Sequence, residues 1–361
     1  MTLAREFLRP SVRKNRPALD HLAFVQDTMP ILRETDFKAA WWLANPHLQT
    51  LWPALLRRLP DPRTVRERIS TPDGDFIDLD WCGESQGPIV LLVHGLSGSS
   101  KSVYIQGMQA ALVKMGLRSV AMNFRGCSEE PNHTARCYHS GDTEDLDFVC
   151  RQLRQRYPQT PLAAVGYSLG GNVLLKWLGE QGEAAGVCAA AAVSSPLQLN
   201  LCADRMDLGF SRVYRDRLID ELRQYISRKQ DHLRLLGEYA ELEKLERLGD
   251  LSDIRSFWEY DERVVARLYQ FADAADYYRK SSSRQYLNAI GVPTLVIQAR
   301  DDPFVTAGVI PTEEELSACV QLEITPQGGH VGFISGHIPG RAAYWLEHRI
   351  PEFIAASLTD S

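Results

Sequence analysis

The 361-residue sequence predicts an α/β fold with a mostly parallel central sheet flanked by helices. From residue 88 onward, short apolar runs of strand length alternate with amphipathic segments of helix length, which is the pattern of parallel strands covered on both faces. Residues 197–285 interrupt the alternation with an almost wholly helical pattern that is charged and rich in leucine, and strands then resume. We therefore expect a helical cap inserted after the sixth strand.

The individual elements follow from the same patterns. The first sixty residues are rich in tryptophan and proline and predict an irregular wrap against the main body. Residues 65–70 and 76–81 predict a hairpin about the turn-forming sequence Pro-Asp-Gly-Asp. After it we expect strands at 88–93, 118–124, 161–166, 187–193, 294–298 and 320–324, and helices at 102–115, 143–157, 169–180 and about 341–357. These boundaries predict an N-terminal wrap at 1–60, an α/β-type core at 61–196 and 286–361, and the cap at 197–285.

Composition excludes several classes of protein. A net charge of −6 leaves no basic surface for nucleic acid. The seven cysteines are odd in number, scattered and without C-x-x-C spacing, so we expect neither a disulfide framework nor a zinc site, and a reduced, cytoplasmic location. No apolar run reaches the length of about 18 residues that spans a membrane, so no integral membrane segment is expected.

The sharpest motif is Gly166-Tyr-Ser168-Leu-Gly170, a G-x-S-x-G pentapeptide between a strand pattern and a helix pattern. A nucleophilic serine must protrude from a tight strand-to-helix turn, and glycines two residues before and after it remove the Cβ atoms that would collide there. The alternative is a buried structural serine. The strand–turn–helix context favours Ser168 as a nucleophile.

A strand that ends in His94-Gly95 precedes this motif. The loop after such a strand supplies one amide of an oxyanion hole, so we assign the backbone N–H groups of Leu96 and Leu169 to that role. His94 could be mistaken for the catalytic base. The chain order serine, acid, histidine favours instead a role in bracing the loop.

The acid and base are expected after the cap. A strand pattern ends in Asp301-Asp302-Pro, and we choose Asp302 as the acid, with Asp301 as the alternative, because adjacent residues point in different directions. His330 lies between glycines just after the last strand and is our choice of base. His337 and His348 fit less well, and no H-E-x-x-H spacing exists, so no metal is expected.

These elements in this order resemble the α/β-hydrolase superfamily, and further strings narrow the resemblance to the YheT-like hydrolases over about residues 36–355. The strings are Asn45-Pro-His-Leu-Gln-Thr50, Asn123-Phe-Arg-Gly-Cys-Ser128, Tyr138-His-Ser-Gly-Asp-Thr-Glu-Asp145, Gly209-Phe-Ser-Arg212, Tyr277-Tyr-Arg279, Asp301-Asp-Pro-Phe304 and Gly329-His-Val-Gly-Phe333. The resemblance implies an α/β-hydrolase fold and a triad of Ser168, Asp302 and His330. It also implies carboxylesterase activity on short or medium acyl esters, without a cofactor.

Several features of the sequence allow more than one interpretation. Glu129 stands where the family usually has glycine, which puts the local turn and the charge at the pocket edge in doubt. The segment 138–140 either lines an acyl pocket or packs beneath the site, 45–50 predicts a clamp for the N-terminal wrap, and Cys127 is expected to be a small buried hydrophobe.

The same triad serves an acyltransferase or ester synthase, and a non-catalytic binding protein could keep the fold. The expected partner is a small-molecule ester.

Overall fold

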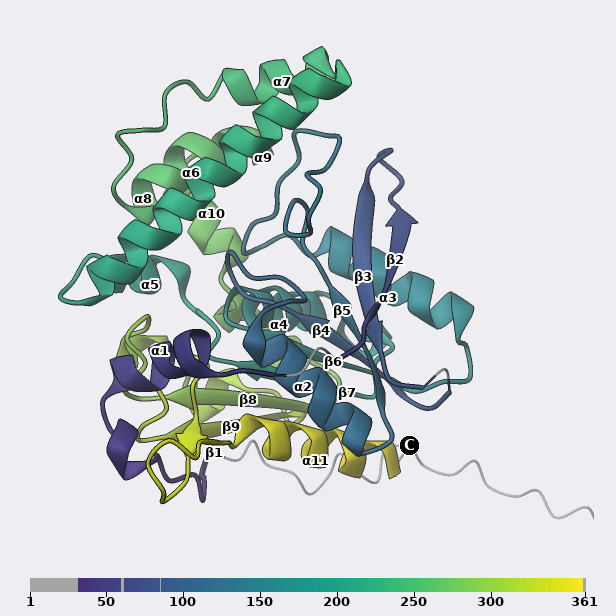
Figure 1. Ribbon diagram of the computed structural model, residues 1–361, viewed down its shortest axis with the longest axis vertical. Helices are drawn as coiled ribbons and strands as arrows, with labels where there is room; N and C mark the ends of the chain where they lie inside the picture. Colours follow the sequence, from purple (N-terminus) through teal and green to yellow (C-terminus); the bar gives the residue numbers. More distant parts are fainter. Residues whose placement is uncertain (1–31, 60–61, 85, 360–361) are drawn as a thin grey trace, which may run out of the picture.

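The computed structural model describes residues 32–59, 62–84 and 86–359, and a twisted sheet runs through its centre (Figure 1). In these residues the sheet has nine strands in the order β1-β9-β8-β7-β6-β4-β5-β3-β2. The strands are β1 (Leu32–Glu34), β2 (Val65–Ser70), β3 (Phe76–Cys82), β4 (Ile89–Val93), β5 (Arg118–Met122), β6 (Leu162–Tyr167), β7 (Ala189–Val193), β8 (Thr294–Ala299) and β9 (Val320–Thr325). Strand β3 pairs antiparallel with β2 and β5, and every other pair is parallel. The predicted mostly parallel sheet is confirmed.

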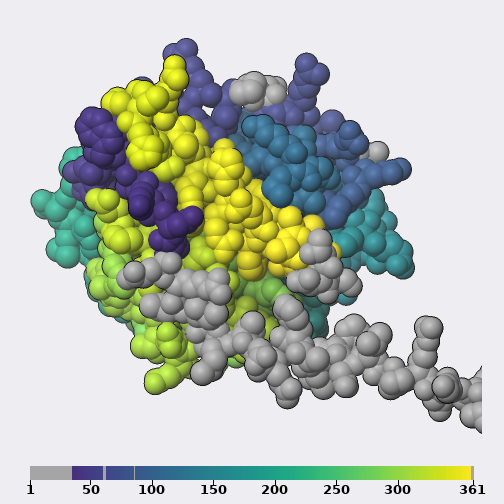
Figure 2. Space-filling view, turned by 90° about the horizontal axis from the view of Figure 1, so that it is seen from below, coloured from purple at the N-terminus to yellow at the C-terminus, as the bar shows by residue number. Residues whose placement is uncertain are grey.

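Helices cover both faces of the sheet, which explains why its central strands are almost continuously apolar. Helices α2 (Val103–Lys114) and α11 (Leu346–Thr359) share one core with Leu92 of β4, while α3 (Glu144–Arg156) and α4 (Leu169–Gln181) share another with Leu91. Adjacent strand residues point to opposite faces, so β4 contributes to both cores. Figure 2 shows α11, in yellow, lying between the N-terminal segment in purple and α2 in blue.

The expected cap is present between β7 and β8, which are the sixth and seventh strands when counting starts at β2. It consists of α5 (Leu199–Met206), α6 (Ser211–Leu236), α7 (Tyr239–Glu246), α8 (Phe257–Tyr260), a π-helical turn (Asp261–Val265), α9 (Ala266–Tyr269) and α10 (Ala274–Ser281). These helices gather on one side of the sheet, at the top of Figure 1. The proposed domain boundaries remain predictions.

The N-terminal region is more regular than the predicted wrap. Residues 1–31 lie outside the described residues, but the rest contains the edge strand β1 and helix α1 (Pro46–Leu56). Asn45 caps α1 by accepting the N–H groups of His47 and Leu48, and Pro46 occupies the first helical position. Both are standard signals for a helix start, and they correct the expectation of an irregular segment.

The last helix also differs from its prediction. It begins at Leu346, not near residue 341, because β11 (Ala343–Tyr344) pairs with β10 (Ile334–Ser335) in a small separate sheet. Short 3-10 turns complete the description at Trp41–Leu43, Gly182–Ala185, Ser283–Ala289, Ala307–Val309 and Glu313–Glu315. Within the described ranges, no helix combines the length and apolar character needed to cross a membrane.

Candidate active site

Ser168 stands at a strained turn between β6 and α4. Its backbone has φ 51° and ψ −121°, a conformation that a residue with a side chain rarely adopts. A Cβ atom at Gly166 would lie 2.5 Å from the carbonyl oxygen of Gly170, and one at Gly170 would collide with the carbonyl of His94. The two glycines of the motif are therefore needed for the serine to stand on this bend against the end of β4.

Two further side chains form a hydrogen-bonded chain with this serine. His330 Nε2 lies 2.9 Å from Ser168 Oγ, and His330 Nδ1 lies 2.8 Å from Asp302 Oδ2. Asp302 Oδ1 accepts the N–H of Phe304 at 2.8 Å, and its side chain is fully buried. The structure thus brings together residues that are up to 162 positions apart in the sequence.

Asp301, the alternative acid, points elsewhere. Its Oδ1 accepts the N–H of Gly329 at 3.0 Å, and burial raises the pKa of its carboxyl above the usual value. The imidazole of His330 therefore meets Asp302 and not Asp301. Of the other histidines considered, neither His337 nor His348 lines the cavity described below.

The loop that carries His330 is held by residues that the sequence did not single out for this role. Thr50 Oγ1, on α1, accepts the N–H of His330 at 2.9 Å, and the ring of Phe304 stacks on the imidazole with centroids 4.0 Å apart. The next residue, Val331, has φ 60°, which is unfavourable for a β-branched side chain. Segment 45–50 therefore supports the loop that carries His330, in addition to its predicted role as a clamp for the N-terminal wrap. Thr50 and Phe304 end two of the motif strings, and no pattern in the sequence indicates their contact with His330.

Gly329 explains how closely α1 approaches this loop. It has φ 60°, and a Cβ atom there would lie 2.5 Å from the carbonyl oxygen of Pro46. Gln49 of α1 is buried. Its side-chain amide donates to the carbonyl of Ile334 at 3.0 Å and accepts the N–H of Ile334 at 2.7 Å. The histidine loop is therefore packed and hydrogen-bonded along its length.

The predicted oxyanion hole consists of the backbone amides of Leu96 and Leu169, and it stays a prediction. Leu169 is the first residue of α4, so its N–H has no acceptor within the helix. In the loop after β4, Gly95 and Ser97 donate their N–H groups to the hydroxyls of Tyr104 and Tyr138, at 2.9 and 3.0 Å, and Leu96 lies between them. A Cβ atom at Gly95 would lie 3.0 Å from Ser168 Cβ, so this loop abuts the serine.

His94 braces that loop. Its Nδ1 donates to the carbonyl of Gly95 at 2.7 Å, and its Nε2 accepts the N–H of Phe124 at 3.1 Å. Complete burial lowers the pKa of the imidazole to about 4. Because both ring nitrogens are engaged and the ring is neutral, His94 has the structural role expected of it.

Ser168 and His330 open onto a cavity of about 120 Å³ between the core and the cap. Most of its wall is apolar and comes from the cap, including Leu199, Cys202, Met206, Leu222, Phe257 and Val265. Leu96, Leu169 and the segment 138–140 complete the wall near the serine. The segment 138–140 therefore lines the cavity, and it is also hydrogen-bonded to the cap, because the N–H of Ser140 donates to the hydroxyl of Tyr277 on α10 at 2.9 Å.

Comparison with known proteins agrees with this architecture. A family model described as the alpha/beta hydrolase fold matches residues 88–337. The chain belongs to this family. Among its relatives are the candidate esterase YheT of Escherichia coli (strain K12), 42% identical with coverage of 87% of this chain and 92% of the relative, and the mouse phospholipase ABHD3, 30% identical with coverage of 92% and 81%.

The chain is accordingly a YheT-like α/β hydrolase, as the motif strings suggested. Among solved structures, the Pyrococcus furiosus esterase Pf2001 superposes with a TM-score of 0.52 at 18% identity, over 81% of this chain and 92% of that one. At this identity the likeness concerns the fold alone.

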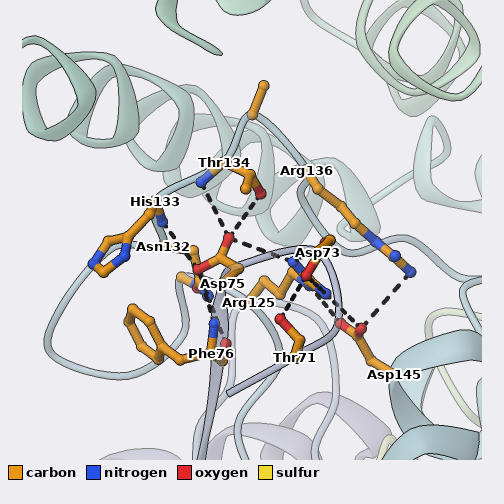
Figure 3. Close-up of polar contacts among 12 residues, drawn as sticks. Thr71, Asp73, Asp75, Phe76, Arg125, Asn132, His133, Thr134, Arg136 and Asp145 are labelled. Carbon is orange, nitrogen blue, oxygen red and sulfur yellow. Dashed lines mark hydrogen bonds and ion pairs between the residues drawn. The ribbon is translucent and has the colours of Figure 1, made fainter. Parts of the chain in front are cut away.

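In this α/β hydrolase, a polar network anchors the loop that follows β5 (Figure 3). The chain continues from this loop to Tyr138. Asp75, after the turn between β2 and β3, accepts the N–H groups of His133 and Thr134 and the side-chain amide of Asn132. Arg125 makes a two-pronged ion pair with Asp145, at 2.7 and 2.8 Å, and also reaches the hairpin turn. The loop is tied to the hairpin on one side and to α3 on the other.

The cap is also hydrogen-bonded to this loop. The hydroxyl of Tyr225 on α6 donates to the carbonyl of Arg125 at 2.8 Å, and buried Lys229 donates to the carbonyl of Arg136. Tyr138 stands at the end of this loop and accepts the N–H of Ser97. Hydrogen bonds therefore connect the cap, this loop and the backbone after β4.

Glu129 lies on the outside of this loop. It forms ion pairs with Arg66 of β2 and with Lys101, and its hydrogen bond from Lys101 contributes most to a pKa lowered to about 2. It is not part of the cavity wall. Replacing the usual glycine with glutamate therefore adds two surface ion pairs and puts no charge on the cavity wall.

Few groups in the described residues could hold a metal. Donor atoms of Glu130, His133 and His232 lie within 4.8 Å of one another, but Glu130 is paired with Arg68 at 2.6 Å and the group lies outside the cavity wall. All seven cysteines are described and free. Burial raises the pKa of the Cys127 thiol to about 12, so this cysteine stays protonated at neutral pH.

Proposed function

We propose that the protein is a serine esterase that cleaves carboxylic esters through Ser168, His330 and Asp302. The observation that carries the proposal is the chain of two hydrogen bonds, 2.8 and 2.9 Å long, that ends at Ser168 on the wall of an apolar cavity. The esterase and phospholipase names of the relatives support the same class of reaction.

The proposed first step forms an acyl-enzyme. His330 Nε2 takes the proton of Ser168 Oγ as that oxygen bonds to the ester carbonyl carbon, and the carboxylate of Asp302 stabilises the imidazolium. The amides of Leu96 and Leu169 hold the carbonyl oxygen as it becomes negative, and losing one such donor typically costs about 3 kcal/mol.

The alcohol leaves at the end of the first step, and the second step releases the acid. When the tetrahedral intermediate collapses, the bond to the alcohol oxygen breaks and that oxygen takes the proton from Nε2 of His330. Water then gives a proton to Nε2 as its oxygen bonds to the acyl carbon. When this second tetrahedral intermediate collapses, the bond between the acyl carbon and Ser168 Oγ breaks, Oγ takes the proton back from Nε2, and the acid leaves.

The cavity favours a short acyl group. Its volume of about 120 Å³ is close to that of an engineered protein cavity of about 150 Å³ that binds benzene. A group of about six heavy atoms has that size, so esters of short acids should be better substrates than those of long fatty acids.

The experiment compares wild type with Ser168→Ala on p-nitrophenyl esters from acetate to palmitate, together with labelling by a fluorophosphonate. We expect turnover and labelling in the wild type, best on short esters, and loss of both in the variant. Ser252→Ala, at an exposed position of the cap, is the matched control and should behave as wild type. Labelling or turnover that survives in Ser168→Ala would refute the role of this serine.

The same assay addresses acyl transfer. An acyl-enzyme can pass its acyl group to an alcohol as well as to water, so adding ethanol and measuring the ethyl ester against the free acid distinguishes an esterase from an ester synthase.

A further inference from the structure

One carboxyl group lies among the described residues of the mostly apolar cavity wall. Asp261 begins the π-helical turn of the cap, and the residue is 9% exposed. It shares the cavity with Ser168 and His330, although it comes from a different part of the chain. Single π-helical turns within α-helices are frequent at functional sites.

The carboxyl has a single hydrogen-bond partner. The hydroxyl of Tyr278 on α10 donates to Oδ2 at 2.6 Å. Within the described residues, the other oxygen, Oδ1, accepts no hydrogen bond and no arginine, lysine or histidine pairs with the group. The titratable groups that act on it or are affected by it are the tyrosines 260, 277 and 278, none of which carries a positive charge.

Such an arrangement is costly for folding. A buried carboxylate that lacks a cation or a full set of donors is destabilising, and burial raises the pKa of Asp261 to about 7. Asp145, another buried acid, is compensated by its ion pair with Arg125. Asp261 is not, although it lies on a wall that a substrate must touch.

The partner of Asp261 is itself held in place. The ring of Tyr278 packs edge-on against Trp258 with centroids 4.6 Å apart, and Trp258 donates its indole N–H to Asp204 at 2.8 Å. Tyr278 therefore holds one carboxyl oxygen of this cavity-lining residue in a fixed position, and the second oxygen is left to accept another hydrogen bond.

We propose that Asp261 determines substrate specificity by accepting a hydrogen bond from a hydroxyl group of the ester, on the portion that fills the cavity. This rests on the proposed esterase function. An ammonium group would offer the same donors, but it costs more to transfer from water into an apolar cavity than a neutral hydroxyl does. The preferred substrate class is thus a short hydroxylated ester.

The experiment measures kcat/KM for matched methyl esters by pH-stat. The pairs are butanoate with 3-hydroxybutanoate, and hexanoate with 6-hydroxyhexanoate and 6-aminohexanoate, so that two hydroxyl positions and one ammonium group are sampled. The proteins are wild type, Asp261→Asn and Asp261→Leu. Asp253→Asn, an exposed cap carboxylate paired with Arg263, is the matched control.

The wild type and the control should favour at least one hydroxylated ester over its plain partner by about tenfold, the ratio that a hydrogen bond of about 1.4 kcal/mol gives. The asparagine variant should keep part of that preference, because its amide oxygen can still accept. The leucine variant should lose the preference, and a cooperative thermal unfolding transition shows that it is folded.

Three results would overturn the inference. These are a wild type that favours both plain esters, a hydroxyl preference that persists in the leucine variant, and an ammonium preference that the leucine variant loses. Turnover of plain butanoate tests the esterase function separately. Binding of the same ester pairs to Ser168→Ala by calorimetry tests the hydroxyl preference without turnover, so that the two proposals can fail independently.

Discussion

Replacing Asp302 with asparagine tests the proposed acid with little change in shape. The amide oxygen can still accept the N–H of Phe304, now 2.8 Å from Oδ1, so the loop keeps its local bond. The amide nitrogen, however, replaces the oxygen that lies 2.8 Å from Nδ1 of His330. An NH₂ group cannot accept the Nδ1–H, so the imidazole changes to the tautomer that carries its proton on Nε2.

That tautomer directs an N–H at Ser168 Oγ, over the present 2.9 Å, and can no longer take the serine proton. The corresponding change in a serine protease lowers kcat by about 10⁴, which corresponds to about 5.5 kcal/mol of transition-state stabilisation. We expect a loss of this size in kcat, with KM nearly unchanged, because the cavity wall and the oxyanion amides are untouched.

The neighbouring Asp301 supplies the matched control. Its carboxylate accepts the N–H of Gly329, a bond that an asparagine oxygen can also accept, so Asp301→Asn should keep kcat within about tenfold of wild type. Steady-state hydrolysis of p-nitrophenyl acetate by both variants gives the comparison. The reasoning would be refuted by Asp302→Asn remaining within tenfold of wild type, or by equal losses in the two variants.

Two further predictions concern groups around the serine. Tyr138→Phe removes the hydroxyl that accepts the Ser97 N–H at 3.0 Å. The neighbouring amide of Leu96, the proposed oxyanion donor, should then be less well placed, and kcat should fall about tenfold at constant KM. A rise in KM alone would assign Tyr138 to substrate binding instead. Asp261→Asn should stabilise the protein increasingly as pH rises. Burial raises the pKa of this acid from 3.8 to about 7, so the ionised carboxylate lowers the free energy of unfolding of the wild type by up to about 4 kcal/mol, and asparagine removes that penalty. The penalty is absent below about pH 4 and complete above about pH 7. Thermal unfolding at pH 5 and pH 8 measures the difference in Tm between variant and wild type, and a difference that does not grow with pH would show that the carboxyl is not desolvated.

Several features of this protein could be predicted because they depend on neighbours in the sequence. The alternation of strand and helix patterns indicated the parallel sheet, and the long helical stretch indicated the cap. The turn at Ser168 could be predicted because its glycines relieve collisions within a few residues of one another. The candidate acid and base could be proposed because each follows a strand of the same sheet, whose carboxyl ends lie at one edge.

Other features were decided by packing between distant segments. Whether Asp301 or Asp302 meets the imidazole depends on the path of a loop, and adjacent carboxylates look alike in the sequence. The bond from Thr50 to the His330 backbone joins residues 280 positions apart, and no local pattern predicts it. In the sequence, Asp261 is one more charge in a polar helical stretch, and only the tertiary structure places it on the wall of the cavity that Ser168 also lines. Local patterns determine local conformation, whereas the environment of a side chain is determined by every segment that packs around it.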